Sequence, residues 1–327
     1  MNPLKYYMGV DGGGSKTYTL IADQSGKIVG KGQSGNGNHQ TDYEEAKHNI
    51  RESVEMALNQ AGLGQSDISF AYFGLAGADR EVDYQILRPM IAELGLPHHD
   101  VNCDTMIALR AGTDRPYGIV LICGTGTNSA GVNPRGDFYQ CGGFSYEFGD
   151  FGGGESLSVE AFRSVIRAWD GREQPTLLTE MLLQEMGYDN MSTLFNDCLD
   201  EDKMPPLSTV KLIFQAAAQA DEVAIRILRA QGVELAKTAV AVIKRLGMEN
   251  EKFDVVLAGS VLTRGEARFI HPYIEQAVKD CAPSASLAKL QVEPVVGAVW
   301  MAFEADGNEI SKEVYDQLRA VSDYSLV

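Results

Sequence analysis

The sequence predicts a protein of two α/β domains, and three observations support this. The chain has 327 residues, more than a typical single hydrophobic core contains. Short apolar runs alternate with helical patterns along the chain. An order of strand, glycine hairpin, strand, turn and strand over residues 6–32 returns at residues 118–143, which indicates an internal duplication.

Composition narrows the class of protein. The 45 acidic and 28 basic residues give a net charge of −17, the wrong sign for a surface that binds nucleic acid or anionic lipid. The chain shows no signal-peptide pattern and no apolar window of about 18 residues, so we expect a cytoplasmic protein. The cysteines are odd in number and form no C-x-x-C pair, so we expect reduced thiols. They are Cys103, Cys123, Cys141, Cys198 and Cys281.

The first half opens with apolar or alternating runs at 6–10, 18–22 and 28–31, which predict a three-stranded antiparallel meander. A helix is expected next, with Thr41 as its cap and Gly62 as its end. A strand over 68–77, a helix over 80–95, a strand over 100–104 and a helix over 105–112 follow, and the first domain is expected to end near residue 116.

The second half is mostly helical from residue 153 to 247. Its longest helix is predicted over 221–246, with one core-facing stripe. "FDVVLAGSVL" predicts a buried strand that runs into a third glycine turn, and helices are expected over 293–305 and about 309–321. The stripe consists of Val223, Ile227, Ala230, Val233, Val240 and Ile243.

The glycine hairpins "DGGGSKT" and "CGTGTNSAG" are the strongest functional signal. Glycine permits positive φ and exposes backbone N–H donors, which phosphate oxygens require. The first hairpin is not a Walker A motif, because Val10 and Ser15 stand where that motif has glycine. The second fails the G-x-G-x-x-G dinucleotide pattern, because it leads into a strand. Each alone is compatible with an ordinary tight turn.

Asp11 makes the first hairpin more specific. It ends a buried strand directly before the turn, where a carboxylate can hold Mg²⁺ through water. Lys16 or the hydroxyls of Ser15 and Thr17 would then meet phosphate oxygens. The third turn, residues 257–262, could take the base and ribose of a nucleotide. Three such turns in this order predict a nucleotide site.

These motifs resemble the phosphate-1, phosphate-2 and adenosine motifs of the actin, hexokinase and Hsp70 ATPase superfamily. The whole chain is similar to the BadF/BadG/BcrA/BcrD ATPase family, and within it to the N-acetylglucosamine kinase-like branch. "GNH", "LAGADRE", "CDTMIAL" and "CGGFSYEFGDFGGG" carry that further resemblance. It implies two duplicated ribonuclease H-like (actin-like ATPase) domains, each a mixed five-stranded sheet flanked by helices, with the active site in the interdomain cleft.

The resemblance also implies the activity. We expect ATP·Mg²⁺-dependent phosphorylation of an amino sugar, either N-acetylglucosamine at its 6-hydroxyl or glucosamine, with hinge closure that expels water. A homodimer is expected, with no nucleic-acid or membrane partner. The expected domains are 1–116, to which a C-terminal helix of about 305–327 returns, and 117–304.

Asp104 is the candidate catalytic base. It follows a strand, so it should lie at a carboxyl end, where open α/β sheets bind ligands. Taken alone it could simply cap the next helix, and the resemblance favours the base, a role it can combine with capping. The expected nucleotide residues are Asp11 (also Mg²⁺, through water), Gly12, Gly13, Gly14, Ser15, Lys16, Thr17, Gly124, Thr125, Gly126, Thr127, Gly259 and Ser260. The expected sugar residues are Asn38, Gly77, Asp79, Asn128, Gly143 and Asp150.

Two departures from the kinase pattern leave the sugar open. Phe144 stands where a tryptophan is expected, and Phe151 replaces an acidic residue. An anhydro or muramic amino sugar, or another hexose, is therefore an alternative. Different functions also remain open: an activator of acyl-CoA dehydratases, with an iron–sulfur cluster on cysteines such as Cys123 and Cys141, or a non-enzymatic nucleotide switch.

Overall fold

The computed structural model describes residues 4–321, and the chain divides into two compact units. Unit 1 is Met1–Val120, Ala130–Gln140 and Ala288–Val327, and unit 2 is Leu121–Ser129 and Cys141–Leu287. Residues 1–3 and 322–327, at the two ends of the predicted first domain, lie outside the described residues. The domain boundaries drawn from the sequence stay a prediction.

The core of unit 1 is a five-stranded mixed sheet with strand order β3-β2-β1-β4-β5. β1, β2 and β3 are antiparallel neighbours, which confirms the predicted meander, while β4 and β5 run parallel to β1. Because β1, β4 and β5 run in one direction, the residues that follow them gather at one edge of the sheet. The strands are β1 (Tyr6–Gly12), β2 (Thr17–Asp23), β3 (Ile28–Ser34), β4 (Ile68–Leu75) and β5 (His99–Cys103).

Helices α1 (Tyr43–Ala61) and α2 (Glu81–Ala92) pack on one face of this sheet. Gly32 permits the close approach of α1, since a Cβ there would overlap the carbonyl oxygen of Ser53. The expected Thr41 cap is wrong: Asp42 is the N-cap, and its carboxylate accepts from the N–H of Glu45 at 2.9 Å. The predicted end at Gly62 is confirmed, with that residue in the left-handed conformation.

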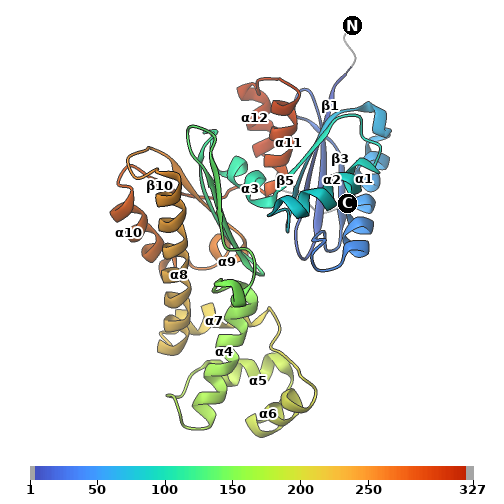
Figure 1. Ribbon diagram of the computed structural model, residues 1–327. Helices are drawn as coiled ribbons and strands as arrows, with labels where there is room; N and C mark the ends of the chain where they lie inside the picture. Colours follow the sequence, from blue (N-terminus) through green and yellow to red (C-terminus); the bar gives the residue numbers. More distant parts are fainter. Residues whose placement is uncertain (1–3, 322–327) are drawn as a thin grey trace. The chain divides into compact units, whose positions relative to one another are not determined.

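The opposite face of the sheet is covered by α3 (Asp104–Gly112), α11 (Pro294–Ala305) and α12 (Lys312–Arg319), as Figure 1 shows. Trp300 of α11 stacks on Tyr315 of α12 with ring centroids 4.1 Å apart. The sequence predicted that a C-terminal helix of about residues 305–327 packs back on the first domain. In the structure α11, which begins at Pro294, is already part of the core on this face.

The second sheet has the order β10-β9-β6-β7-β8. Taken from its other edge, this order matches that of the first sheet strand for strand, so the duplication inferred from the repeated glycine hairpins is present in the fold. Both predicted five-stranded sheets are confirmed. The strands are β6 (Gly118–Cys123), β7 (Thr127–Val132), β8 (Phe138–Cys141), β9 (Asp254–Ala258) and β10 (Ser286–Lys289).

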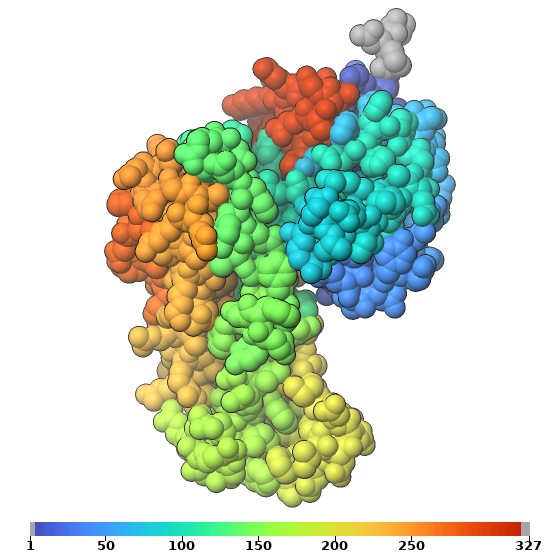
Figure 2. Space-filling view, in the orientation of Figure 1, coloured from blue at the N-terminus to red at the C-terminus, as the bar shows by residue number. Residues whose placement is uncertain are grey.

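Unit 2 also holds a helical region. Within it, α5 and α6 gather beyond the end of α4 that points away from the sheet, and form the yellow-green lobe of the space-filling view (Figures 1 and 2). The helices of this unit are α4 (Gly153–Trp169), α5 (Leu178–Met186), α6 (Met191–Asp200), α7 (Thr209–Ala218), α8 (Glu222–Leu246), α9 (Ser260–Thr263) and α10 (His271–Cys281).

The long helix α8 corrects one expectation. Val223, Ile227 and Ile243 of the predicted stripe are buried, whereas Ala230 is exposed and Val233 and Val240 are only half-buried, so the stripe coincides with only part of the buried face. That face runs through positions such as Leu228 and Leu235, because a 25-residue helix drifts around its axis relative to a short repeat. Within residues 4–321, no helix has both the length and the apolar character needed to cross a membrane.

Candidate active site

The turn between β1 and β2 presents open backbone. Gly13 donates its N–H to the carbonyl of Lys16 at 2.9 Å and closes the turn. Gly14 and Ser15 at its tip are exposed, and no heavy atom lies within 4 Å of the place that a Gly14 Cβ would occupy. A ligand could therefore approach this backbone closely.

The two side chains after the tip differ in availability. Lys16 is exposed, and its ammonium donates to the hydroxyl of Tyr18 at 2.9 Å. Thr17 is fully buried, and its hydroxyl donates to the carbonyl of Gly35 at 3.0 Å. The structure thus places Lys16 where it could meet a phosphate, while the Thr17 hydroxyl supports the loop that follows β3.

Asp11, at the carboxyl end of β1, lies in a strongly acidic environment. The pKa of Asp11 is raised to about 8: burial is the main cause, the charges of Asp104 and Glu293 act in the same direction, and Lys16 opposes them. The group is therefore short of positive charge, and a bound cation would favour the ionised form of Asp11.

Asp104 is the first residue of α3, and Cys103 rather than Asp104 occupies the N-cap position. Burial raises the pKa of Asp104 to about 6, and the charge of Asp79 contributes in the same direction. Hydrogen bonds from the Cys103 thiol, at 3.3 Å, and from the Thr105 N–H act against this rise. A carboxylate with a pKa just below neutrality is suited to accept a proton.

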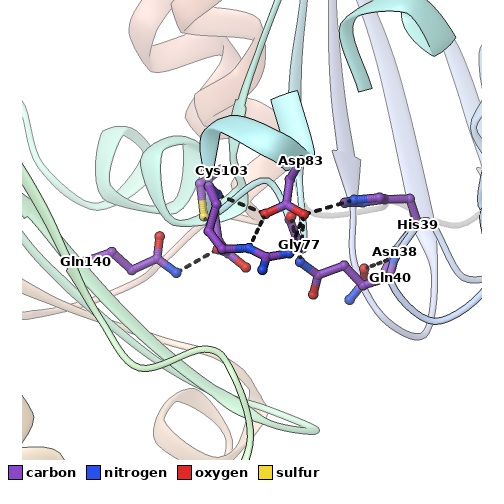
Figure 3. Close-up of polar contacts among 9 residues, drawn as sticks. Asn38, His39, Gln40, Gly77, Asp83, Cys103 and Gln140 are labelled. Carbon is purple, nitrogen blue, oxygen red and sulfur yellow. Dashed lines mark hydrogen bonds and ion pairs between the residues drawn. The ribbon is translucent and has the colours of Figure 1, made fainter. Parts of the chain in front are cut away.

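Asp79, in the loop between β4 and α2, is held by two donors. The side-chain amide of Gln140 donates to its Oδ1 at 2.6 Å, and the Cys103 sulfur lies 3.5 Å from the same oxygen. Gly77 in this loop has φ +80°, and a Cβ there would lie 2.5 Å from Oδ1 of Asn38. The predicted sugar residues of unit 1 therefore belong to two loops that touch (Figure 3).

A cluster of polar contacts around the buried Asp83 carboxylate ties these two loops together. Asp83 accepts from the guanidinium of Arg80 at 2.9 and 3.0 Å and from the Gln40 amide at 3.3 Å. His39 Nε2 lies 3.5 Å from the same carboxylate, as Figure 3 shows. Burial would raise the pKa of Asp83, but the bonds from Arg80 and Gln40 prevail and lower it to about 2. Gln40 also donates to the carbonyl of Gly77 at 3.1 Å.

In unit 2, three glycine segments meet around the second hairpin. Gly124 donates to the carbonyl of Gly126 at 2.9 Å, and Gly154 of α4 donates to the carbonyl of Gly124 at 2.7 Å. Gly259, after β9, has φ +83°, and a Cβ there would overlap the carbonyl of Cys123. The phosphate-2 and adenosine turns predicted from the sequence therefore lie side by side.

Beside these turns lies a cavity of about 500 Å³. Its floor is glycine backbone, and helix α7 with the segment before it supplies an apolar wall. The 260–266 segment adds charged groups. A flat apolar ring with a polar edge would fit such a lining. The lining includes Gly124, Thr125, Gly154, Leu207, Val210, Lys211, Phe214, Gln215, Ser260, Arg264 and Glu266.

Asp150 organises the loop after β8. Its Oδ2 accepts from the N–H groups of Gly143, Phe144 and Ser145 at 2.9, 2.6 and 2.8 Å. Ser145 has φ +117°, a strained conformation that these three charge-assisted bonds help to maintain. A Cβ at Gly143 would lie 2.8 Å from the amide of Asn128. The predicted sugar residues of unit 2 thus form one group.

The sequence model of the BadF/BadG/BcrA/BcrD ATPase family matches residues 8–302, which is most of the chain. The chain belongs to the BadF/BadG/BcrA/BcrD ATPase family. This confirms the resemblance drawn from the glycine hairpins and the four further motifs.

Curated relatives of this BadF/BadG family member include two sugar kinases. One is the N-acetylmuramic acid/N-acetylglucosamine kinase of Clostridium acetobutylicum, 30% identical over 91% of this chain and 98% of the relative. The other is the N-acetyl-D-glucosamine kinase of Dictyostelium discoideum, 28% identical over 91% of this chain and 98% of the relative. A crystal structure from Chromobacterium violaceum, described as a candidate N-acetylglucosamine kinase, superimposes with a TM-score of 0.69 at 22% identity. It covers 92% of this chain and 99% of that one, and supports the fold.

Several residues of this BadF/BadG family site escaped the sequence analysis. Asp83 and Arg80 form a capping box at the start of α2, a local signal that could have been used. Cys103 and Gln140 contact Asp79 from other elements, and the apolar wall contributed by α7 has no motif. The spacing of residues in the sequence could reveal neither these contacts with Asp79 nor the wall on α7, because only the fold brings the residues together.

Proposed function

We propose that this protein is an ATP-dependent kinase that phosphorylates a hydroxyl of an amino sugar. The observation that carries the proposal is the acidic group at the carboxyl edge of the first sheet, that of unit 1, where the pKa of Asp104 is raised to about 6 beside Asp11 and Asp79. The family and the two curated sugar kinases support it.

Asp104 serves as the general base. With a pKa of about 6 the carboxylate is mostly ionised at neutral pH, yet basic enough to accept a hydroxyl proton as the oxygen attacks. The sugar oxygen forms a bond to the γ-phosphorus, the bond from that phosphorus to the ADP oxygen breaks, and the hydroxyl proton moves to Asp104.

The glycine turns hold the nucleotide. We assign the phosphates to the open backbone of residues 12–17 and 124–127, with Lys16 as the cation of the first turn, because N–H groups free of side chains suit phosphate oxygens. We assign the adenosine to the cavity beside Gly259 and Ser260, whose apolar wall on α7 includes Phe214.

Mg²⁺ fits the residues at Asp11. Burial is the main cause of the raised pKa of this carboxyl group, and the negative charges of Asp104 and Glu293 add to it; a divalent cation would neutralise these charges. Residues 4–321 contain no cluster of three or more metal-ligating side chains. Mg²⁺ commonly binds through one or two carboxylates together with substrate phosphates, so we assign Asp11 as its protein anchor, through water. When bound, the ion would neutralise phosphate charge.

The sugar is assigned to Asn38, Gly77 and Asp79 in unit 1 and to Asn128, Gly143 and Asp150 in unit 2. We propose N-acetylglucosamine, phosphorylated at its 6-hydroxyl, or glucosamine as the substrate. Asp150 uses one oxygen to hold the backbone of residues 143–145, so its main effect on the sugar is through the shape of this loop. Phe144 and Phe151 keep muramic sugars among the substrates to be tested.

The first experiment is phosphoryl transfer from ATP·Mg²⁺ to a panel of sugars, with the product identified by mass. The panel contains N-acetylglucosamine, glucosamine, N-acetylmuramic acid and its anhydro form, N-acetylmannosamine and glucose. We expect a sugar phosphate with at least one amino sugar and its loss in Asp104→Asn. Slow ATP hydrolysis that no sugar accelerates would refute the kinase and favour a nucleotide switch.

A coloured protein with bound iron would instead favour the dehydratase activator. Of the two cysteines considered as ligands of an iron–sulfur cluster, Cys123 is poorly suited to that role. Cys123 is fully buried, and burial raises its pKa to about 12, whereas an iron–sulfur cluster requires thiolates. The homodimer and the cytoplasmic location expected from the sequence stay predictions, which light scattering and fractionation would test.

A further inference from the structure

Cys103 lies between two carboxylates of the proposed site. Its sulfur is 3.3 Å from Oδ1 of Asp104 and 3.5 Å from Oδ1 of Asp79, and the residue is fully buried. A neutral thiol has a single hydrogen to donate. The two carboxylates therefore share one donor.

The surroundings keep this thiol protonated. Burial raises the pKa of Cys103 well above its ordinary value, and the charges of Asp104 and Asp79 act in the same direction. Cys103 is therefore a neutral donor throughout the working pH range and adds no further anion to an acidic site. Because the thiol stays protonated, it always has a hydrogen to donate to one of the two carboxylates.

Asp79 is also held by a second donor, which does not depend on Cys103. Gln140, from β8, donates to the same Oδ1 of Asp79 at 2.6 Å (Figure 3). The contacts thus run from Gln140 through Asp79 and Cys103 to Asp104, and they join β8, the loop before α2 and the start of α3. The orientation of each carboxylate depends on its neighbour in this series.

We propose that Cys103 is a positioning residue that couples the sugar-binding carboxylate Asp79 to the base Asp104. The inference rests on the proposed kinase function and deepens it. A sugar hydroxyl that donates to Asp79 replaces the thiol there, and the thiol is then left to donate to Asp104 alone. Sugar binding thereby keeps Asp104 ionised, because a hydrogen bond to the charged form of a carboxyl group lowers its pKa.

Other titratable groups around the pair do not take over this function. Asp11 and Glu293 face the site from β1 and from the segment before α11, and both are acidic. Tyr84 of α2 adjoins Cys103, and burial raises the pKa of that phenol, which keeps it neutral. Lys16 is the cation whose charge acts on Asp11. The thiol at position 103 is placed to donate its single hydrogen to either carboxylate, because its sulfur lies within reach of both.

The test compares Cys103→Ala, which removes the donor, with Cys103→Ser, which keeps one. The readout is the pH dependence of kcat/KM for the sugar at saturating ATP. The acid limb of this profile is the fall of kcat/KM at low pH. We expect its midpoint to shift to a pH higher by about 0.5–1 unit in the alanine variant, as loss of a modest hydrogen bond to a charged group predicts. The serine variant should return it to within about 0.3 unit of wild type, following the same relation between hydrogen bonding and pKa.

A matched control is Cys198→Ala, which removes another buried thiol, on α6, and should leave the limb in place. If the alanine variant at position 103 does not fold, Cys103→Val supplies a donor-free side chain that fills the space. The proposal is overturned if the midpoint of the acid limb does not shift in a folded, active variant without the donor, Cys103→Ala or Cys103→Val. It is also overturned if the midpoint shifts and Cys103→Ser does not restore it.

A second arm does not depend on activity. In urea unfolding, Cys103→Ala and Asp104→Asn should be non-additive, with a coupling of at least about twofold in the unfolding equilibrium. If the wild type phosphorylates no sugar, the proposed function fails, and this arm alone decides about Cys103. Additive midpoint shifts would then overturn the coupling.

Discussion

Replacing Asp11 by asparagine should stabilise the ligand-free protein while it abolishes activity. The folded-state pKa of Asp11 is raised from 3.8 to about 8, so folding disfavours the ionised form. Stability is therefore lost progressively as pH rises from the unfolded pKa towards the folded one. At pH 7, which lies about 3 units above the unfolded pKa of 3.8 and still below the folded one, the stability lost has an upper bound of about 4 kcal/mol.

We expect about 1–3 kcal/mol of this to be realised, because water and side-chain relaxation raise the effective dielectric constant around a half-buried group. With about 2–4 °C per kcal/mol for a unit of this size, the melting temperature of Asp11→Asn should exceed that of wild type by several degrees at pH 7. The gain should shrink towards pH 4, where the wild-type carboxyl is protonated in the folded state and already about half protonated in the unfolded state.

Scanning calorimetry of both proteins between pH 4 and 8, without nucleotide, measures this difference. Asp189→Asn, at an exposed position, is the control for loss of a charge at the surface and should change little. ATP·Mg²⁺ should stabilise the wild type more than the variant. An Asp11→Asn protein that melts at or below the wild-type temperature at every pH would refute the view that folding raises the pKa of Asp11.

Three further outcomes follow from the site. The kcat/KM of the wild type should fall about tenfold between pH 7 and pH 5, because ionised Asp104 is required and its pKa is about 6; a flat profile excludes it as the base. Gly77→Ala should raise the sugar KM and spare the ATP KM, since its Cβ meets Asn38; Gly95→Ala, also at positive φ but in open space, is the matched control. Phe214→Ala should raise the ATP KM about tenfold or more, in line with the loss of a buried aromatic contact, and an unchanged value would contradict the nucleoside assignment.

Local patterns in the sequence were sufficient for the scaffold. Alternating apolar runs and glycine turns predicted both meanders, and the repeated order of elements predicted two matching sheets. These signals depend on residues close together in the chain, where the periods of strand and helix are visible. The position of Asp104 after a strand was likewise a local inference that the structure upheld.

Tertiary contacts account for what the sequence did not provide. Thr17 belongs to a phosphate motif by spacing, yet its hydroxyl is taken by Gly35, a contact made only once β2 and the loop after β3 are folded. Asp150 stays a predicted sugar residue, and the structure adds that its Oδ2 accepts three backbone N–H groups. Gln140 and Cys103 reach Asp79 from other elements. No periodicity records such convergence.

The acidic edge of the first sheet connects stability with function. Three neighbouring carboxylates, of which Asp104 raises the pKa of Asp11 and Asp79 raises the pKa of Asp104, are unfavourable in the empty protein, and a fold selected for stability alone would not retain them. The same charges become favourable when a cation arrives with the nucleotide and a sugar hydroxyl needs a base. A neutral thiol between Asp79 and Asp104 suits this arrangement, because it supplies a donor without cancelling the charge on which cation binding depends. The distribution of donors around Asp11, Asp79 and Asp104 therefore determines both how strongly the empty site is strained and how readily the base works once the substrates bind.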